Sequence, residues 1–261
     1  MTTIVHSHLQ RSPANTATRA EPLLQRSRQP RLLLGLILSA ALGVAALEIV
    51  TIDSHSLISH TLSELFYAPG GQILFPAVTV LLAGSVLLWA RMLFGQTFRA
   101  AGIVAAIGGF SLLLAAIFST DPAGTSVLSI SAHIHRYGAA GMFIAVPVAG
   151  LLAAHAATSR AATSRTATSR TRTPRAAGRN LVVTAAVLSA LAAFPALGGR
   201  LESLASPGTW QDLMRAFGAA CGLVERIQLF LVIAIVVAST QALIQPNDQR
   251  KTAPLAVHKQ E

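Results

Sequence analysis

The run LLLGLILSAALGVAALEIV, from Leu32 to Val50, decides the fold because its nineteen residues carry a single charge, Glu48. At 1.5 Å per residue, an α-helix of this length covers about 30 Å, the thickness of the hydrocarbon core of a bilayer. The run exceeds the roughly 7–15 apolar residues of a signal peptide, and no cleavage site follows it. We therefore predict a transmembrane helix that stays in the mature protein.

Five further apolar runs follow along the chain. Each approaches or exceeds the ~20 residues that a membrane helix needs, and none alternates with the period of two that a membrane β-barrel would show. The sequence therefore predicts an all-α fold, an integral membrane bundle of six transmembrane helices. The five runs are Ile73–Leu93, Ala100–Phe118, Tyr137–Ala157, Leu181–Leu197 and Ala219–Leu243.

The composition points to the same environment. Hydrophobic residues make up 52% of the 261-residue chain and charged residues 11%, against about 25% charged residues in soluble domains. The net charge of +10 does not indicate nucleic-acid binding, because the basic residues lie in the tails and short connections. The lipid bilayer is the expected partner. The abundance of Ala and the preference for Arg over Lys favour a bacterial source, so we expect a multi-pass protein of the bacterial cytoplasmic membrane.

The arginines predict the orientation. Of the twenty basic residues, sixteen fall in the two tails and in the second and fourth connections, and three fall in the other connections. The remaining one, Arg226, lies inside the last apolar run. Because positive charge collects on the cytoplasmic side, both termini are predicted to be cytoplasmic, which requires an even number of spans. Trp89, Trp210 and Tyr137 lie near the predicted membrane boundaries, where we expect them to form an aromatic belt.

The domain organisation follows from these spans. Residues 1–31 are predicted to be a disordered cytoplasmic tail, residues 32–243 the six-helix transmembrane domain, and residues 244–261 a second cytoplasmic tail. Within the domain, three copies of Ala-Thr-Ser-Arg follow one another at a five-residue period from Ala157 to Arg170, and all but the first Ala fall in residues 158–180. This period matches neither a helix nor a strand, so we predict a disordered, Arg-rich cytoplasmic loop.

Polar residues gather on the predicted outer side. The stretch FSTDPAGTSVLSISAHIHRYGAAG, Phe118 to Gly141, separates two apolar runs. Glu48 lies within a turn of the outer end of the first helix, and the Glu225–Arg226 pair lies about 9–11 Å down the sixth. Ionisable residues inside a membrane are rare and usually functional. We therefore predict an outward-facing polar pocket lined by Glu64, Asp121, His133, His135, Glu225 and Arg226.

Each of these residues also has a purely structural interpretation. Asp121 is placed to end a helix, the two histidines are typical of a headgroup boundary, and Glu225–Arg226 could be an ion pair that locks the sixth helix to a neighbour. Zinc is a weak hypothesis, with His133, His135 and Asp121 as ligands, because the chain has no His-Glu-x-x-His motif. Haem is weaker still, because the histidines lie in connections rather than on facing helices.

Four short motifs carry a resemblance to a known family. They are LSELFYAPGG after the first helix, FSTDP after the third, a His before the fourth, and GLVERIQ in the sixth. In this order they resemble the bacterial and archaeal multi-pass membrane family catalogued as domain of unknown function 998, over about residues 32–243. The resemblance implies a six-helix membrane protein and supplies no activity. The positions that match are Ser63, Glu64, Asp121, Pro122, His133, Glu225 and Arg226.

Three functions stay open at this point. The first is binding of a small polar ligand or a lipid headgroup in the outer pocket, for transport or sensing. The second is a structural or assembly role without small-molecule chemistry, for which the small residues of GIVAAIGG and GAAGMFIAVPVAG would permit close helix packing. The third is an intramembrane metal-dependent hydrolase. An enzyme is the less favoured class, and six spans also allow a homo-oligomer.

Overall fold

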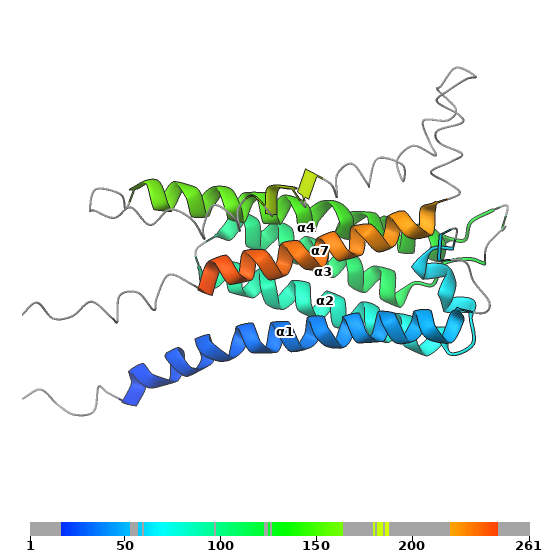
Figure 1. Ribbon diagram of the computed structural model, residues 1–261, viewed down its shortest axis with the longest axis horizontal. Helices are drawn as coiled ribbons and strands as arrows, with labels where there is room; N and C mark the ends of the chain where they lie inside the picture. The colour runs from blue at the N-terminus through cyan, green and yellow to red at the C-terminus, as the bar shows by residue number, and fades with distance from the viewer. Residues whose placement is uncertain are drawn as a thin grey trace, which may run out of the picture.

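The part of the chain that the structure describes is all-helical. A computed structural model describes residues 17–52, 57–58, 60–96, 98–122, 125, 127–163, 180, 182–184, 186–187 and 220–244. Five α-helices and one short 3₁₀ helix, η2, account for most of this part of the chain (Figure 1). Their bounds are α1 (Ala17–Thr51), η2 (Leu62–Tyr67), α2 (Gly71–Gly95), α3 (Arg99–Ile117), α4 (Ile130–Thr163) and α7 (Cys221–Ile244).

Five stretches of these helices are long and apolar enough to cross a membrane, which confirms five of the six predicted spans. They are Arg28–Thr51, Gly71–Gly95, Arg99–Ile117, Ile130–Ala157 and Cys221–Gln241. Of the remaining predicted span, Leu181–Leu197, only residues 182–184 and 186–187 are described, and they are helical. Val182 and Ala186 are buried. The rest of that span lies outside the described residues.

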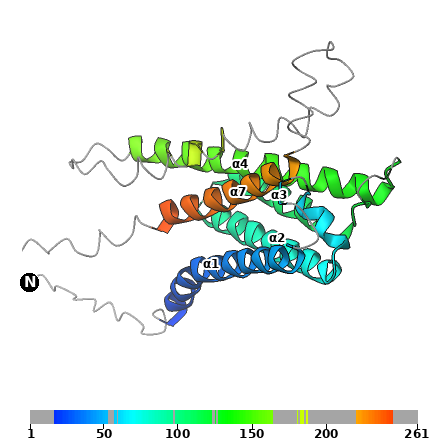
Figure 2. The same ribbon diagram turned by 45° about the vertical axis from the view of Figure 1, so that its right-hand side comes forward.

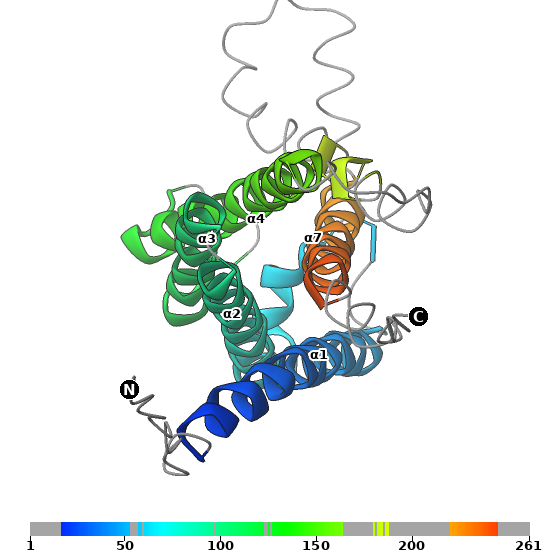
Figure 3. The ribbon, with the colours of Figure 1, turned by 90° about the vertical axis from the view of Figure 1, so that its left-hand side faces the viewer.

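The helices are arranged as a ring when viewed along their axes (Figure 3). Neighbours in the sequence pack together from α1 to α4, and α7 packs mainly against α4. The contact between α1 and α7 is slight, although these two helices complete the ring. η2 lies at one end of the bundle, beside the first turns of α7, and Figure 2 shows it from a second direction. We call this end of the bundle the η2 end.

The chain direction of α4 and α7 is the same. Both helices begin at the η2 end: the Leu223 amide of α7 donates to the Ile58 carbonyl, 3.1 Å away, and the Ser131 hydroxyl of α4 donates to the Ser119 carbonyl, 2.8 Å away. Both helices then run to the opposite end (Figure 1). The chain between them therefore begins at one end of the bundle and finishes at the other.

Glycines bring neighbouring helices close together. A Cβ on Gly138 of α4 would lie 2.6 Å from the Ser111 carbonyl oxygen of α3, and one on Gly141 would lie 2.7 Å from the Ser111 hydroxyl. A Cβ on Gly150 would lie 2.5 Å from Ile235 of α7. In lipid, helices associate through such packing because apolar burial gives little driving force there. The predicted close packing by small residues is therefore confirmed for the third and fourth spans.

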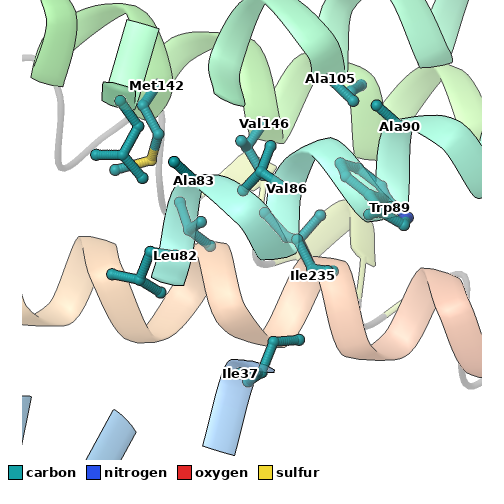
Figure 4. Packing of buried hydrophobic residues seen from close by; sticks show 14 of the residues in the cluster. Ile37, Leu82, Ala83, Val86, Trp89, Ala90, Ala105, Met142, Val146 and Ile235 are labelled. Carbon is teal, nitrogen blue, oxygen red and sulfur yellow. The ribbon is translucent and has the colours of Figure 1, made fainter. Parts of the chain in front are cut away.

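The interior is filled by aliphatic side chains around one tryptophan. Trp89 is 0% exposed and belongs to the same buried cluster as Val86, Val146 and Ile235, which come from three different helices (Figure 4). The prediction that Trp89 belongs to an interfacial belt is therefore wrong, because its large ring fills the space between the helices. Tyr137 is 62% exposed, as a belt residue would be. Trp210 lies outside the described residues.

Two helices continue past the predicted borders of the membrane domain. α1 begins at Ala17, inside the tail that was predicted to be disordered, and α4 continues to Thr163, past the predicted start of the Arg-rich loop. Ala, Leu, Gln and Arg are good helix formers, and extending an existing helix adds one hydrogen bond for each residue that is fixed. Residues 1–16 and 164–179 lie outside the described part of the chain.

We expect Gly138→Ala to destabilise the bundle, because the added methyl group meets backbone atoms of α3 that cannot move independently. Overpacking of this kind costs about 1–3 kcal/mol. The measurement is the thermal midpoint in detergent. Gly84→Ala is the matched control, since no atom lies within 4 Å of its added Cβ. Equal midpoints for the two variants would contradict the close approach of α3 and α4.

Candidate functional site

Arg226 joins the last described helix to the first. Its Nε donates to Glu48 Oε1 of α1 at 2.6 Å, and the two side chains are only 12% and 18% exposed. Its Nη1 donates to the carbonyls of His60 and Gly222, each at 2.9 Å. One guanidinium thus contacts α1, α7 and the connection after α1. This contact completes the ring where α1 and α7 otherwise barely touch.

Glu225, the preceding residue, holds η2. Its Oε2 accepts a hydrogen bond from the Leu62 amide at 2.7 Å. Adjacent positions on a helix point about 100° apart, so Glu225 and Arg226 reach different neighbours. Gly222 makes the approach possible, because a Cβ there would lie 2.1 Å from the His60 carbonyl oxygen. The start of α7 is therefore shaped to fit the connection.

Glu64 stabilises η2 locally. Its Oε2 accepts from the Thr61 amide at 3.2 Å, which is half of the capping-box arrangement seen at helix N-termini. Leu62 and Leu65 of η2 are buried. We call Glu48, Glu64, Glu225 and Arg226 the α7 cluster.

Asp121 has a different partner, at the junction of α3 and α4. Its two carboxylate oxygens accept from the Ser129 amide at 2.6 Å and the Ser129 hydroxyl at 2.7 Å. These bonds lower the pKa of Asp121, first through the amide and then through the hydroxyl, and the charges of Arg136 and His133 lower it further. The Ser129 hydroxyl in turn accepts from the Ala132 amide at 3.1 Å, so Ser129 is the N-cap of α4.

The two predicted histidines have separate roles. His135 is 4% exposed, and its Nδ1 lies 2.8 Å from the Ala115 carbonyl and 2.9 Å from the Phe118 carbonyl. Both partners are acceptors, so Nδ1 donates, and it satisfies carbonyls at the C-terminus of α3 that have no helical partner. His133 is exposed and stacks on Tyr137, with ring centroids 6.3 Å apart. We call Asp121, Ser129, His133 and His135 the α4 cluster.

The two clusters lie at the same end of the bundle but use different partners. Their link is Tyr67 at the end of η2, whose hydroxyl donates to the Thr120 carbonyl, next to Asp121. Desolvation, and then the negative charge of Asp121, raises the pKa of Tyr67. Glu64, Glu225 and Arg226 therefore come together with Glu48, whereas Asp121, His133 and His135 gather around the start of α4. No contact between described residues joins all six predicted residues in one pocket.

Some polar atoms at and below the η2 end have no partner. Glu48 Oε2 and Gln228 Nε2 are buried and make no hydrogen bond within the described part of the chain. Gln228 is 5% exposed and lies three residues after Glu225. The sequence analysis missed Gln228 and also missed Ser129. The sequence did contain a signal for Gln228: it is a long polar residue inside an apolar run, two positions after Arg226.

Metal ligation gains no geometric support. Among the residues that the structure describes, no three His, Cys, Asp or Glu side chains are placed to hold one metal ion. The weak zinc hypothesis named His133, His135 and Asp121. His135 Nδ1 is directed at two carbonyls, and both Asp121 oxygens are bonded to Ser129.

The helices and their polar end define a multi-pass α-helical membrane protein. The chain belongs to the family described as Protein of unknown function (DUF998), which matches residues 33–242. This range contains nearly all of the five described spans, and the match confirms the resemblance carried by the four motifs. No curated protein and no solved structure matches the chain.

We expect Arg226→Gln to lower the thermal midpoint more than Arg91→Gln, whose side chain is exposed. Losing the guanidinium leaves the Glu48 carboxylate without its donor, which we expect to cost about 3–5 kcal/mol. Because the two residues form one pair, Glu48→Gln with Arg226→Gln should cost less than the sum of the single changes. Additive losses, or equal midpoints for Arg226→Gln and Arg91→Gln, would show that this pair does not hold α1 and α7 together.

Proposed function

We propose that the chain crosses a bacterial cytoplasmic membrane six times, with both termini in the cytoplasm and the helices forming one domain over residues 32–243. The shared direction of α4 and α7 supports a further crossing between them, and Leu181–Leu197 is the apolar run available for it. Exposed arginines at the end opposite η2 support a cytoplasmic location for that end. They are Arg28, Arg31, Arg91 and Arg99.

The topology is tested by cysteine labelling in a Cys221→Ala background. A cysteine at Thr125, near the η2 end, should react with a membrane-impermeant maleimide added to intact cells. A cysteine at Thr168, in the Arg-rich repeat, should react only after the cells are permeabilised. Labelling of both positions from the same side would overturn the six-span arrangement.

The second part of the proposal is that the η2 end binds a small polar ligand or a lipid headgroup, for transport or sensing. The observation that carries it is Gln228, a buried amide whose nitrogen has no partner among the described residues. Leaving such a group unsatisfied costs about 1–3 kcal/mol. A bound polar molecule would remove this cost.

The position of Gln228 supports a ligand site on the interior side of α7. Residues three apart lie on one face of a helix, so Gln228 is one turn below Glu225. The buried residues Leu229 and Val232 belong to the same interior face of α7. Glu225 in turn holds the Leu62 amide of η2. The proposed ligand therefore lies beneath η2, with Gln228 as a donor to it.

Gln228→Leu separates this proposal from its alternative. If a ligand satisfies the amide, native mass spectrometry of the purified protein should show a bound mass that Gln228→Leu loses and Arg91→Gln keeps. The thermal midpoint of Gln228→Leu should then fall, because the variant no longer gains stability from the bound ligand. An unchanged spectrum with a raised thermal midpoint would instead show that the substitution only removed an unsatisfied polar group.

The alternative is a structural or assembly protein, alone or as a homo-oligomer. The partners of the charged groups favour it. Arg226 binds Glu48 and two carbonyls, Glu225 binds the Leu62 amide, and both oxygens of Asp121 bind Ser129. On this hypothesis the polar residues hold the connections in place, and the surface available to partners is the outer, lipid-facing side of the bundle.

A further inference from the structure

The outward face of α4 changes in character along its length. Near its middle it presents Ile144 and Val148, which are 50% and 41% exposed. Towards the η2 end the same face presents Tyr137, Arg136 and His133, all exposed. An apolar stripe thus leads up to a basic and aromatic group of side chains on the lipid-facing side of one helix.

The depth of this group matches the headgroup layer. The span Ile130–Ala157 has 28 residues, about 42 Å of helix, whereas the hydrocarbon core is about 30 Å thick and the whole bilayer about 40–45 Å. His133 and Arg136 are about 4.5 Å and 9 Å from the start of the span. Side chains on a helix tilt towards its N-terminus, which for α4 is the η2 end, so the Arg136 guanidinium is directed back towards the membrane surface.

Arg136 has no hydrogen bond or ion pair with any residue that the structure describes, although Asp121 is close enough to feel its charge. Both oxygens of Asp121 are taken by Ser129 instead. His133 is held against Tyr137 by ring stacking, three residues before Arg136. A stacked imidazole beside a guanidinium that has no partner within the described ranges offers several N–H donors to one anion.

We propose that the outward face of α4 binds one phospholipid of the leaflet at the η2 end. The phosphodiester lies between Arg136 and His133, the Tyr137 ring lies at the level of the glycerol backbone, and an acyl chain lies along Ile144 and Val148. Arginine suits this role because its planar fork of donors fits two phosphate oxygens. This site lies on the outside of the ring, so it does not depend on the ligand proposed beneath η2.

The test is native mass spectrometry of the full chain titrated with phosphatidylglycerol. Arg136→Gln should weaken binding of the first lipid about fivefold, the effect of one basic residue near an anionic surface. His133→Asn should weaken it as well, and the double variant should lose less than the product of the two factors because both contact one phosphate. When Arg136→Gln is combined with Arg91→Gln, which lies at the other end of the bundle, the factor by which lipid binding weakens should instead equal the product of the two single factors. All variants should keep the parent thermal midpoint, because the altered side chains are exposed.

Two further arms decide the source of the phosphate. An excess of inorganic phosphate should leave lipid binding unchanged, because the free ion lacks the acyl chain; displacement of the lipid would make a soluble phosphate compound the ligand and overturn the proposal. Arg136→Lys should recover only part of the affinity. Unchanged phosphatidylglycerol binding by Arg136→Gln would show that these residues form a membrane-boundary belt only.

Discussion

The contact of Arg226 with Glu48 is the constraint on which the closed bundle depends. The apolar helices from α1 to α4 pack as sequence neighbours, but α1 and α7 meet over little apolar surface. The seam between them is closed by one guanidinium that satisfies a carboxylate and two carbonyls. At the edge of a bilayer such groups have little water to bind, so their partners must come from within the protein. The first and last described spans are therefore joined through polar chemistry rather than through shape alone.

The sequence predicted the fold because hydrophobic length is a local property that each run carries by itself. It also placed Glu64, Asp121, His133, His135, Glu225 and Arg226 at one end of the bundle, because each lies at a known distance from a span boundary. The sequence could not show which of these six residues contact one another. The partners of Asp121 and His135 are a capping serine and two backbone carbonyls, and nothing in the composition distinguishes those from their neighbours. Burial of Trp89 was missed for the same reason, since depth along a helix does not give the direction in which a side chain points.

The two polar clusters hold different parts of the η2 end. The α7 cluster fastens η2 and α1 to the start of α7, and the amide nitrogen of Gln228, one turn further along α7, has no partner among the described residues. The α4 cluster shapes the turn between two closely packed helices and leaves His133, with the neighbouring Arg136, facing outwards. A sequence motif such as His-x-His thus splits between a buried carbonyl-binding histidine and an exposed one. The closeness of the two histidines along the chain therefore did not bring them into a common site.

The pairing of Glu48 with Arg226 also sets an order of events during synthesis. The partners are 178 positions apart. At about 5–20 residues per second, the ribosome needs roughly 9–36 s after making Glu48 before Arg226 is made. Throughout that interval the carboxylate waits at the membrane edge without its guanidinium. A chain that stops before its last helix cannot form this contact, so closure of the bundle between α1 and α7 has to be a late step that follows synthesis of α7.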